Sequence, residues 1–330
     1  MVRPYLLGGA TRTSTGRPFD RRIETGLDIM QQLSSGVSGL LSLNTDFAET
    51  EVDTRQVNLT RFPLFFLEGA DIFSFGLGLR HDLVPFFTRR IGLVQGQVVP
   101  LDLALKVTGH VRNTSLGLLD VWTHRVAGLA PRRNLFAGRI YQNLWRESRA
   151  GMLITIGDPV RTDPGWLVGI DFTYKTTRFR GDKVFLVGVW GLLNQRIARD
   201  IAWGFKIDYP NDLWDMALVY KYIGPYFDPA LGFVPWTGIH RLSFGINYMP
   251  RPDWPWLRQM FHELQGNLVY NLEGYLLQWR IFTAPINWRL ESGDRFEWNV
   301  VPQGEWVPET FTITPEVYVA PGAINGSDIA

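Results

Sequence analysis

Apolar and polar residues alternate along most of this chain of 330 residues. Between Trp166 and Tyr174 every second residue is apolar, and Gly169, Asp171 and Thr173 fall between them. A period of two indicates a β-strand with one apolar and one polar face. The same pattern recurs in segments 19–31, 37–43, 101–110, 201–209, 214–221 and 242–248. In segment 101–110 it assigns Leu101 to the same apolar row as Leu103.

The connections between these segments are short, as at Pro210-Asn211-Asp212. Strands joined by tight connections are antiparallel neighbours. We count about 14 strands of roughly 9–12 residues, near the length that crosses a bilayer when tilted. The predicted fold class is therefore all-β, an antiparallel meander.

Amphipathic aromatic residues end many of the apolar rows. They are Trp166, Tyr174, Tyr209, Trp214, Tyr220 and Tyr248. Such rings are favoured at a membrane interface. The pattern predicts an outer-membrane-type β-barrel with lipid as its partner. A soluble β-sandwich or barrel stays open as an alternative, because alternation alone does not distinguish a core from lipid.

The composition excludes several classes of partner and cofactor. The net charge of +1 gives no reason to expect nucleic acid, and the absence of cysteine excludes disulfides and thiolate metal sites. Apolar runs such as Phe185–Leu193 are about half of the roughly 20 residues that a membrane helix needs. Met1–Leu7 does not resemble a signal peptide. No metal or cofactor is predicted, since the histidines lack ligand spacing and nucleotide motifs are missing.

One stretch, residues 44–75, breaks the alternation. It combines carboxylates, arginines and a run of phenylalanines, a mixture that suits neither lipid nor an ordinary surface loop. We expect it to lie inside the barrel as a plug. The residues predicted to anchor the plug or bind a ligand are Asp46, Asp53, Arg55, Asn58, Arg61, Glu68, Arg89 and Arg90. Their charges nearly balance, which favours mutual pairing.

The same carboxylates raise the question of catalysis. Two carboxylates at a suitable separation could serve glycoside hydrolysis as acid and as base or nucleophile. The candidates are Glu49, Glu51, Asp53 and Glu68. Pairing with arginines is the favoured interpretation, so no catalytic residue is assigned and enzyme activity stays an open alternative. A calcium site is disfavoured because the regular Asp-x-Asp-x-Asp-Gly spacing is missing.

Several blocks of sequence are similar to a bacterial family known as domain of unknown function 5916. The blocks are Leu43–Asp53, Arg55–Phe62, Phe66–Phe73, Pro85–Gly92 and Phe227–Pro235, within a resemblance that spans residues 41–322. The resemblance implies an outer-membrane β-barrel. It also implies an upstream domain like the family 9 carbohydrate-binding modules, and hence a candidate carbohydrate ligand.

Two departures from the family pattern affect the expected architecture. Phe65-Phe66 runs directly into Leu67-Glu68-Gly69, where family members carry a longer insertion. Family members also continue beyond the position of Pro321. We therefore expect residues 1–330 to be one barrel domain that is a fragment of a longer protein. An incomplete barrel would be open, or would need a partner chain, because unpaired strand edges are costly in lipid.

The resulting functional hypothesis is an outer-membrane barrel domain that handles or transports a surface carbohydrate. A membrane-anchored glycoside hydrolase and a soluble β-rich binding protein are the two alternatives. Charged residues on the outer face would favour the soluble protein.

Overall fold

The computed structural model describes residues 1–11, 20–45, 70–79, 82–307, 309–314 and 317–329. The described chain is almost entirely β-structure, which confirms the predicted all-β class. Its helical parts are two short 3-10 turns, η1 (Ala70–Phe73) and η2 (Thr88–Arg90). Neither has the length or the apolar character to cross a membrane as a helix.

Seventeen strands form one sheet, and two small two-stranded sheets accompany it. The strands are β1 (Val2–Thr11), β2 (Asp20–Ser34), β3 (Val37–Thr45), β4 (Leu93–Val94), β5 (Gln97–Val98), β6 (Leu101–Val111), β7 (Thr114–Thr123), β8 (Arg133–Leu144), β9 (Ser148–Ile156), β10 (Trp166–Phe179), β11 (Lys183–Gln195), β12 (Arg199–Pro210), β13 (Trp214–Ile223), β14 (Ile239–Tyr248), β15 (Leu257–Met260), β16 (His262–Asn271), β17 (Leu276–Leu290), β18 (Arg295–Val307), β19 (Phe311–Thr314), β20 (Val317–Val319) and β21 (Gly322–Ile329).

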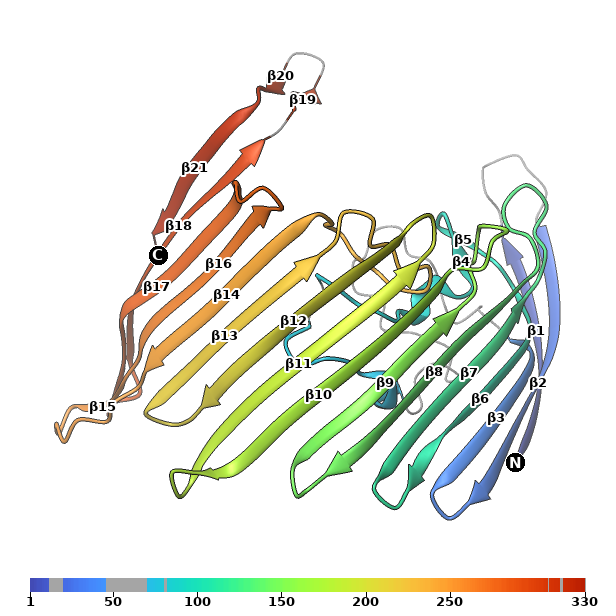
Figure 1. Ribbon diagram of the computed structural model, residues 1–330, viewed down its shortest axis with the longest axis horizontal. Coiled ribbons are helices and arrows are strands. Elements are labelled where there is room, and N and C mark those ends of the chain that lie inside the picture. The colour runs from blue at the N-terminus through green and yellow to red at the C-terminus, as the bar shows by residue number, and fades with distance from the viewer. Residues whose placement is uncertain (12–19, 46–69, 80–81, 308, 315–316, 330) are drawn as a thin grey trace.

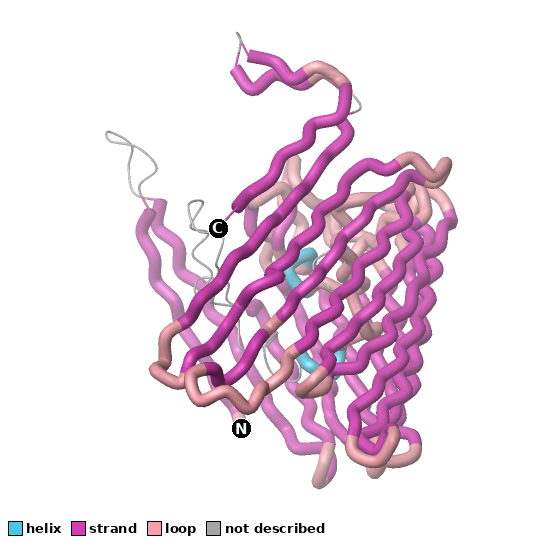
Figure 2. The backbone as a smooth tube through the Cα atoms, turned by 90° about the vertical axis from the view of Figure 1, so that its left-hand side faces the viewer, coloured by secondary structure: helices cyan, strands magenta, loops and turns pink. Residues whose placement is uncertain are grey.

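The large sheet is an antiparallel meander. Each strand pairs with the next along the chain, apart from the excursions at β4–β5, β15 and β19–β20. The sheet is strongly curved, as Figures 1 and 2 show, and it does not close. Among the described residues, β1 pairs only with β2, and β21 pairs only with β18. The meander is thus confirmed, whereas a closed barrel is not observed.

The two faces of the sheet differ in how far their side chains are buried. On β10 the side chains of Trp166, Val168 and Ile170 face outward, while Leu167 and Asp171 face the hollow and are buried. Cross-strand pairing carries this division across the sheet, because directly opposite residues share a face. Large apolar side chains remain exposed on the convex face, and Ile170 keeps 64% of its surface accessible.

Leu101 does not follow the predicted apolar row. It is fully buried, whereas Leu105 is exposed on the convex face. The register of β6 against β7 shifts between Leu101 and Leu103, and such an irregularity moves the residues on one side of it to the other face. Alternation alone could not reveal this shift.

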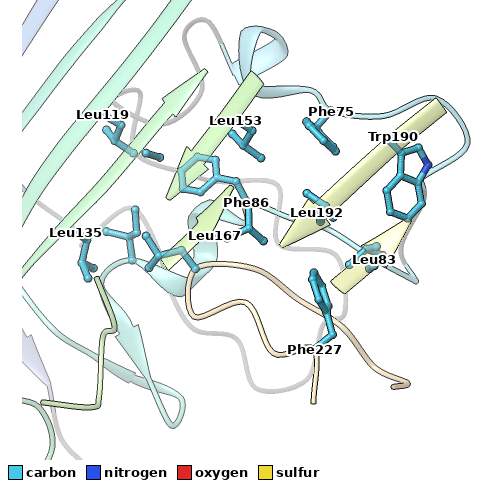
Figure 3. Close-up of a cluster of buried hydrophobic side chains, with 14 of the residues drawn as sticks. Phe75, Leu83, Phe86, Leu119, Leu135, Leu153, Leu167, Trp190, Leu192 and Phe227 are labelled. Carbon is cyan, nitrogen blue, oxygen red and sulfur yellow. The ribbon is translucent and has the colours of Figure 1, made fainter. Parts of the chain in front are cut away.

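The hollow of the sheet is filled by the inner segment, defined here as residues 70–79 and 82–99 (Figure 1). Its apolar side chains pack against those of the concave face and of the loop 224–238. Figure 3 shows this core, which includes Phe75, Leu83, Phe86, Leu119, Leu135, Leu153, Leu167, Trp190, Leu192 and Phe227. Close approach requires small residues on the sheet, and a Cβ atom on Gly188 would lie 2.4 Å from the Cβ of Leu77. Asn44 and Thr45, predicted to begin the internal stretch, instead end β3, and residues 46–69 of that stretch lie outside the described residues.

The packing of the core predicts that replacing either of two adjacent aromatic residues has a very different effect on the free energy of unfolding. Phe227 is fully buried in the core, whereas Tyr226 is 68% exposed. Replacing Phe227 by Ala should lower the free energy of unfolding by about 3–5 kcal/mol, because it leaves a cavity. Tyr226→Ala should change it by less than about 0.5 kcal/mol. Urea unfolding in detergent, followed by tryptophan fluorescence, measures both, and equal effects would contradict this packing.

Candidate functional site

A buried ion pair joins two strands of the concave face. Arg139 of β8 and Asp171 of β10 form a bidentate contact, with Nη1–Oδ1 at 2.6 Å and Nη2–Oδ2 at 2.9 Å. Their side chains are 0% and 1% exposed. The pair reaches across β9 at Gly151, where a Cβ atom would lie 2.6 Å from Arg139 Nη1. Glycine at this position therefore leaves room for the guanidinium.

The same pair binds the backbone of the inner segment. Arg139 Nε donates to the carbonyl oxygen of Ser74 at 3.1 Å, and the amide of Gly76 donates to Asp171 Oδ2 at 3.3 Å. The guanidinium also lies 5.1 Å from the ring centroid of Phe75. Buried charges need such additional partners to offset their desolvation. The sheet thereby holds residues 74–76 in one position.

A second ion cluster holds the inner segment further along. Asp82 lies 2.8 Å from Lys221 Nζ on β13 and 2.9 Å from Arg241 Nη1 on β14. Burial alone would raise the pKa of Asp82, but the two cations outweigh it and lower this pKa below its ordinary value. Asp82 is therefore a fixed anion and is unsuited to donate a proton.

Two loops at the end of the sheet are joined by Arg196. Its Nε lies 2.6 Å from Asp158 Oδ2, and its Nη1 lies 2.9 Å from Asp228 Oδ2. The backbone amides of Val160 and Arg161 also donate to Asp158. Burial opposes ionisation of both partners, but their contact prevails, so that the pKa of Asp158 is lowered and that of Arg196 is raised.

The loop 224–238 also clasps the inner segment through its backbone. Val84 and Phe233 form an antiparallel bridge, and the amide of Phe87 donates to the carbonyl oxygen of Leu231 at 2.8 Å. Arg90 Nε donates to the carbonyl oxygen of Gly232 at 2.9 Å. Two sequence blocks that are far apart, 85–92 and 227–235, are thus one structural unit.

Beyond the inner segment, the concave face forms an open cavity of about 880 Å³ under β12–β14, β16 and β17, lined by both polar and apolar side chains. Asp82, Lys206, Asp208, Asp215, Lys221, Arg241, Ser243, Asn247, Gln265, Asn267 and Arg280 contribute its polar lining. The cavity has room because small residues such as Ala217 and Gly245 line the adjacent strands. It is large enough for a small polar solute.

The residues predicted from sequence are only partly within this picture. Arg90 makes the contact to Gly232 described above, and the Arg89 guanidinium lies 5.8 Å from the ring of Phe87. The other predicted anchors and all four catalytic candidates lie outside the described residues: Asp46, Glu49, Glu51, Asp53, Arg55, Asn58, Arg61 and Glu68. Their predicted roles stay predictions.

Sequence reasoning did not single out Arg139, Asp171, Asp82, Lys221 or Arg241. Three of them could have been identified from the alternation, because Asp171, Lys221 and Arg241 stand at the polar positions of amphipathic strands. Within the described part of the chain, no cluster of three or more His, Asp or Glu side chains could hold a metal ion. The ion pairs described above therefore hold the inner segment in place against the sheet.

Comparison with known proteins adds no assignment: no family model, no curated protein and no solved structure matches this chain. The resemblance to domain of unknown function 5916 therefore stays a prediction.

The buried pair predicts a strong effect of removing one charge. Asp171→Asn leaves the Arg139 guanidinium without its buried counter-ion. The free energy of unfolding should fall by about 3–5 kcal/mol. Asp182→Asn is the matched control, since Asp182 is exposed, and it should cost less than about 1 kcal/mol. Denaturation in urea compares them, and a neutral Asp171→Asn would show that the pair does not hold the fold.

The lowered pKa of Asp158 predicts acid sensitivity of the two joined loops. Because the folded pKa lies below the ordinary value of 3.8, ionised Asp158 stabilises the fold above that value. The contribution is lost as the pH falls through the folded pKa. The stability difference between wild type and Asp158→Asn should therefore be constant from pH 7 to about 5 and shrink below about pH 4. Thermal unfolding over this pH range measures it, and a difference that grows on acidification would refute the assignment.

Proposed function

We propose that this chain forms the wall of an outer-membrane β-barrel whose interior binds or passes a polar solute. The observation that carries the proposal is the composition of the convex face over β10–β16. From β10 to β16 its outward positions contain no Asp, Glu, Lys or Arg in segments 166–174, 185–193, 201–209, 214–222, 240–248 and 262–270. A soluble sheet would place charges there, whereas lipid favours their absence.

Aromatic side chains flank this uncharged band at both ends. Trp214 and Tyr248 form a tilted ring pair with centroids 4.5 Å apart at one end, and Trp203 and Tyr222 stack at 6.4 Å near the other. The eight residue steps from Trp214 to Tyr222 span about 26 Å along the strand. A strand tilt of about 40° reduces this to about 20 Å of height, close to the apolar band of roughly 25 Å in outer-membrane barrels.

The strand count supports closure within the chain. β15 and β16 pair with consecutive parts of β17 and share one position, so the seventeen strands occupy sixteen positions. An even number makes β1 and β21 run in opposite directions, as barrel closure requires in bacterial outer-membrane proteins. In this proposal the two free edges pair in the membrane, which removes the unsatisfied backbone groups that lipid penalises. A second chain at these edges is the alternative.

The interior provides the solute-handling part of the proposal. The cavity with its charged side chains lies inside the same wall, next to the inner segment, which acts as a plug in this proposal. The predicted solute class, a surface carbohydrate or a related polar ligand, comes from the family resemblance. Among the cavity carboxylates of the described residues, Asp82 is held as an anion by two cations, so it does not supply the acid of a glycosidase pair.

The proposal predicts that two adjacent substitutions behave differently. Leu218 faces outward in the middle of β13, whereas Ala217 lines the cavity. Leu218→Arg should cost about 2–4 kcal/mol in the bilayer and reduce folding into lipid vesicles, because it places a charge in hydrocarbon. Ala217→Arg should fold like the wild type. Heat-modifiable gel mobility and protease protection in dilauroylphosphatidylcholine vesicles report folding.

Two results would contradict the proposal. One is a wild-type chain that folds in buffer without detergent or lipid and does not enter vesicles. The other is equal insertion of both arginine variants, since the convex face would then not contact lipid.

A further inference from the structure

The cavity under β12–β14, β16 and β17 has an uneven distribution of charge. Four cationic side chains and three carboxylates line it: Lys206, Lys221, Arg241 and Arg280, with Asp82, Asp208 and Asp215. The side chains that line the cavity therefore carry a net charge of +1, but which cations lack a partner matters more for binding than this total. Each carboxylate already has a partner, whereas the cations do not all have one.

The carboxylates are engaged as follows. Asp82 is shared by Lys221 and Arg241, so that this group of three keeps one positive charge. Asp208 lies 2.5 Å from Lys206 on the same strand, which makes a neutral pair. Asp215 accepts a hydrogen bond from the Asn247 amide at 3.3 Å.

Arg280 is the cation without a counter-ion in the described part of the chain. It lies on the concave side of β17, opposite Asn267 on β16 and Gln303 on β18. Glu305 stands two residues from Gln303 on β18, but it forms no ion pair with Arg280 there. A guanidinium that faces a cavity in this way is available to an oxyanion.

Uncommitted hydrogen-bond donors lie beside Arg280. The Ser243 hydroxyl donates to Asn267 Oδ1 at 2.9 Å, so the Asn267 N–H groups have no acceptor among the described residues. Arg241 uses Nη1 for Asp82, and its Nε is buried out of reach of the cavity, so this residue contributes positive charge and not a free donor. Asn267 is the direct cross-strand neighbour of Arg280, so the donors of these two side chains lie side by side, and Arg241 lies diagonally from Asn267 on β14.

We propose that this cavity binds the oxyanion group of a small solute, a carboxylate or a phosphate, at Arg280 and Asn267, beside the positively charged group of Asp82, Lys221 and Arg241. The inference names the chemical class of the solute for the proposed barrel interior and rests on that function. Arg280 supplies the planar donor pair that matches an oxyanion, and Asn267 adds a neutral donor. The positive group around Asp82 favours the bound negative charge from one side.

The test is isothermal titration calorimetry of the full chain, folded in a non-ionic detergent, with inorganic phosphate and, in parallel, acetate. Wild type should bind at least one of them. Arg280→Gln should weaken this binding by at least about tenfold, because a charge-assisted contact is lost. Arg280 is exposed to the cavity and has no described ion pair, so the fold should persist. Arg295→Gln is the control, since this exposed arginine lies at the start of β18 and outside the cavity.

The outcomes separate this inference from the proposed function. If wild type enters vesicles but binds neither phosphate nor acetate, the anion site is wrong and the barrel proposal stands. Equal weakening by Arg280→Gln and Arg295→Gln would also overturn the site, because general surface charge would then explain the binding. If binding depends on Arg280 but the chain does not enter vesicles, the site stands and the barrel proposal fails.

Discussion

The buried contact between Arg139 and Asp171 is the interaction on which the interior of this protein depends. Neither side chain reaches solvent, so the charges must satisfy one another and the backbone groups around them. Those groups are the carbonyl of Ser74 and the amide of Gly76. An apolar pair of similar volume could be as stable, but it would not choose a position for the backbone. The ion pair therefore determines where the inner segment lies.

The other ionic contacts fix the position of the inner segment further along the hollow of the sheet. Asp82 attaches the next turn of the inner segment to β13 and β14, and Arg90 attaches it to the loop 224–238. Apolar side chains fill the space between these points, as Phe75 and Phe86 do against the concave face. Packing supplies most of the stability, whereas the charged contacts select one arrangement of the segment among many of similar apolar content.

Much of the fold could be predicted from the sequence, because alternation reports directly on the two faces of a strand. The segments 166–174, 201–209 and 242–248 are strands with the expected faces. The candidate site could not be predicted in the same way. Asp82 and Lys221 are 139 residues apart, and Arg139 reaches Asp171 only because Gly151 lies between them. Such contacts depend on strand order and local space, which no periodicity encodes.

The free edge at β1 shows how closure and edge protection compete. Met1 and Met30 exchange two backbone hydrogen bonds, so the backbone groups of Met1 face β2. Every second residue of an antiparallel strand faces the same neighbour, so the backbone groups of Arg3 also face β2. Pro4 lies between such positions, and its missing N–H therefore falls on the free edge. Proline there discourages pairing with unrelated chains in water. In lipid the balance reverses, because one absent ladder bond costs far less than a whole row of unsatisfied groups. Closure against β21 is therefore compatible with Pro4, provided that it occurs in the membrane.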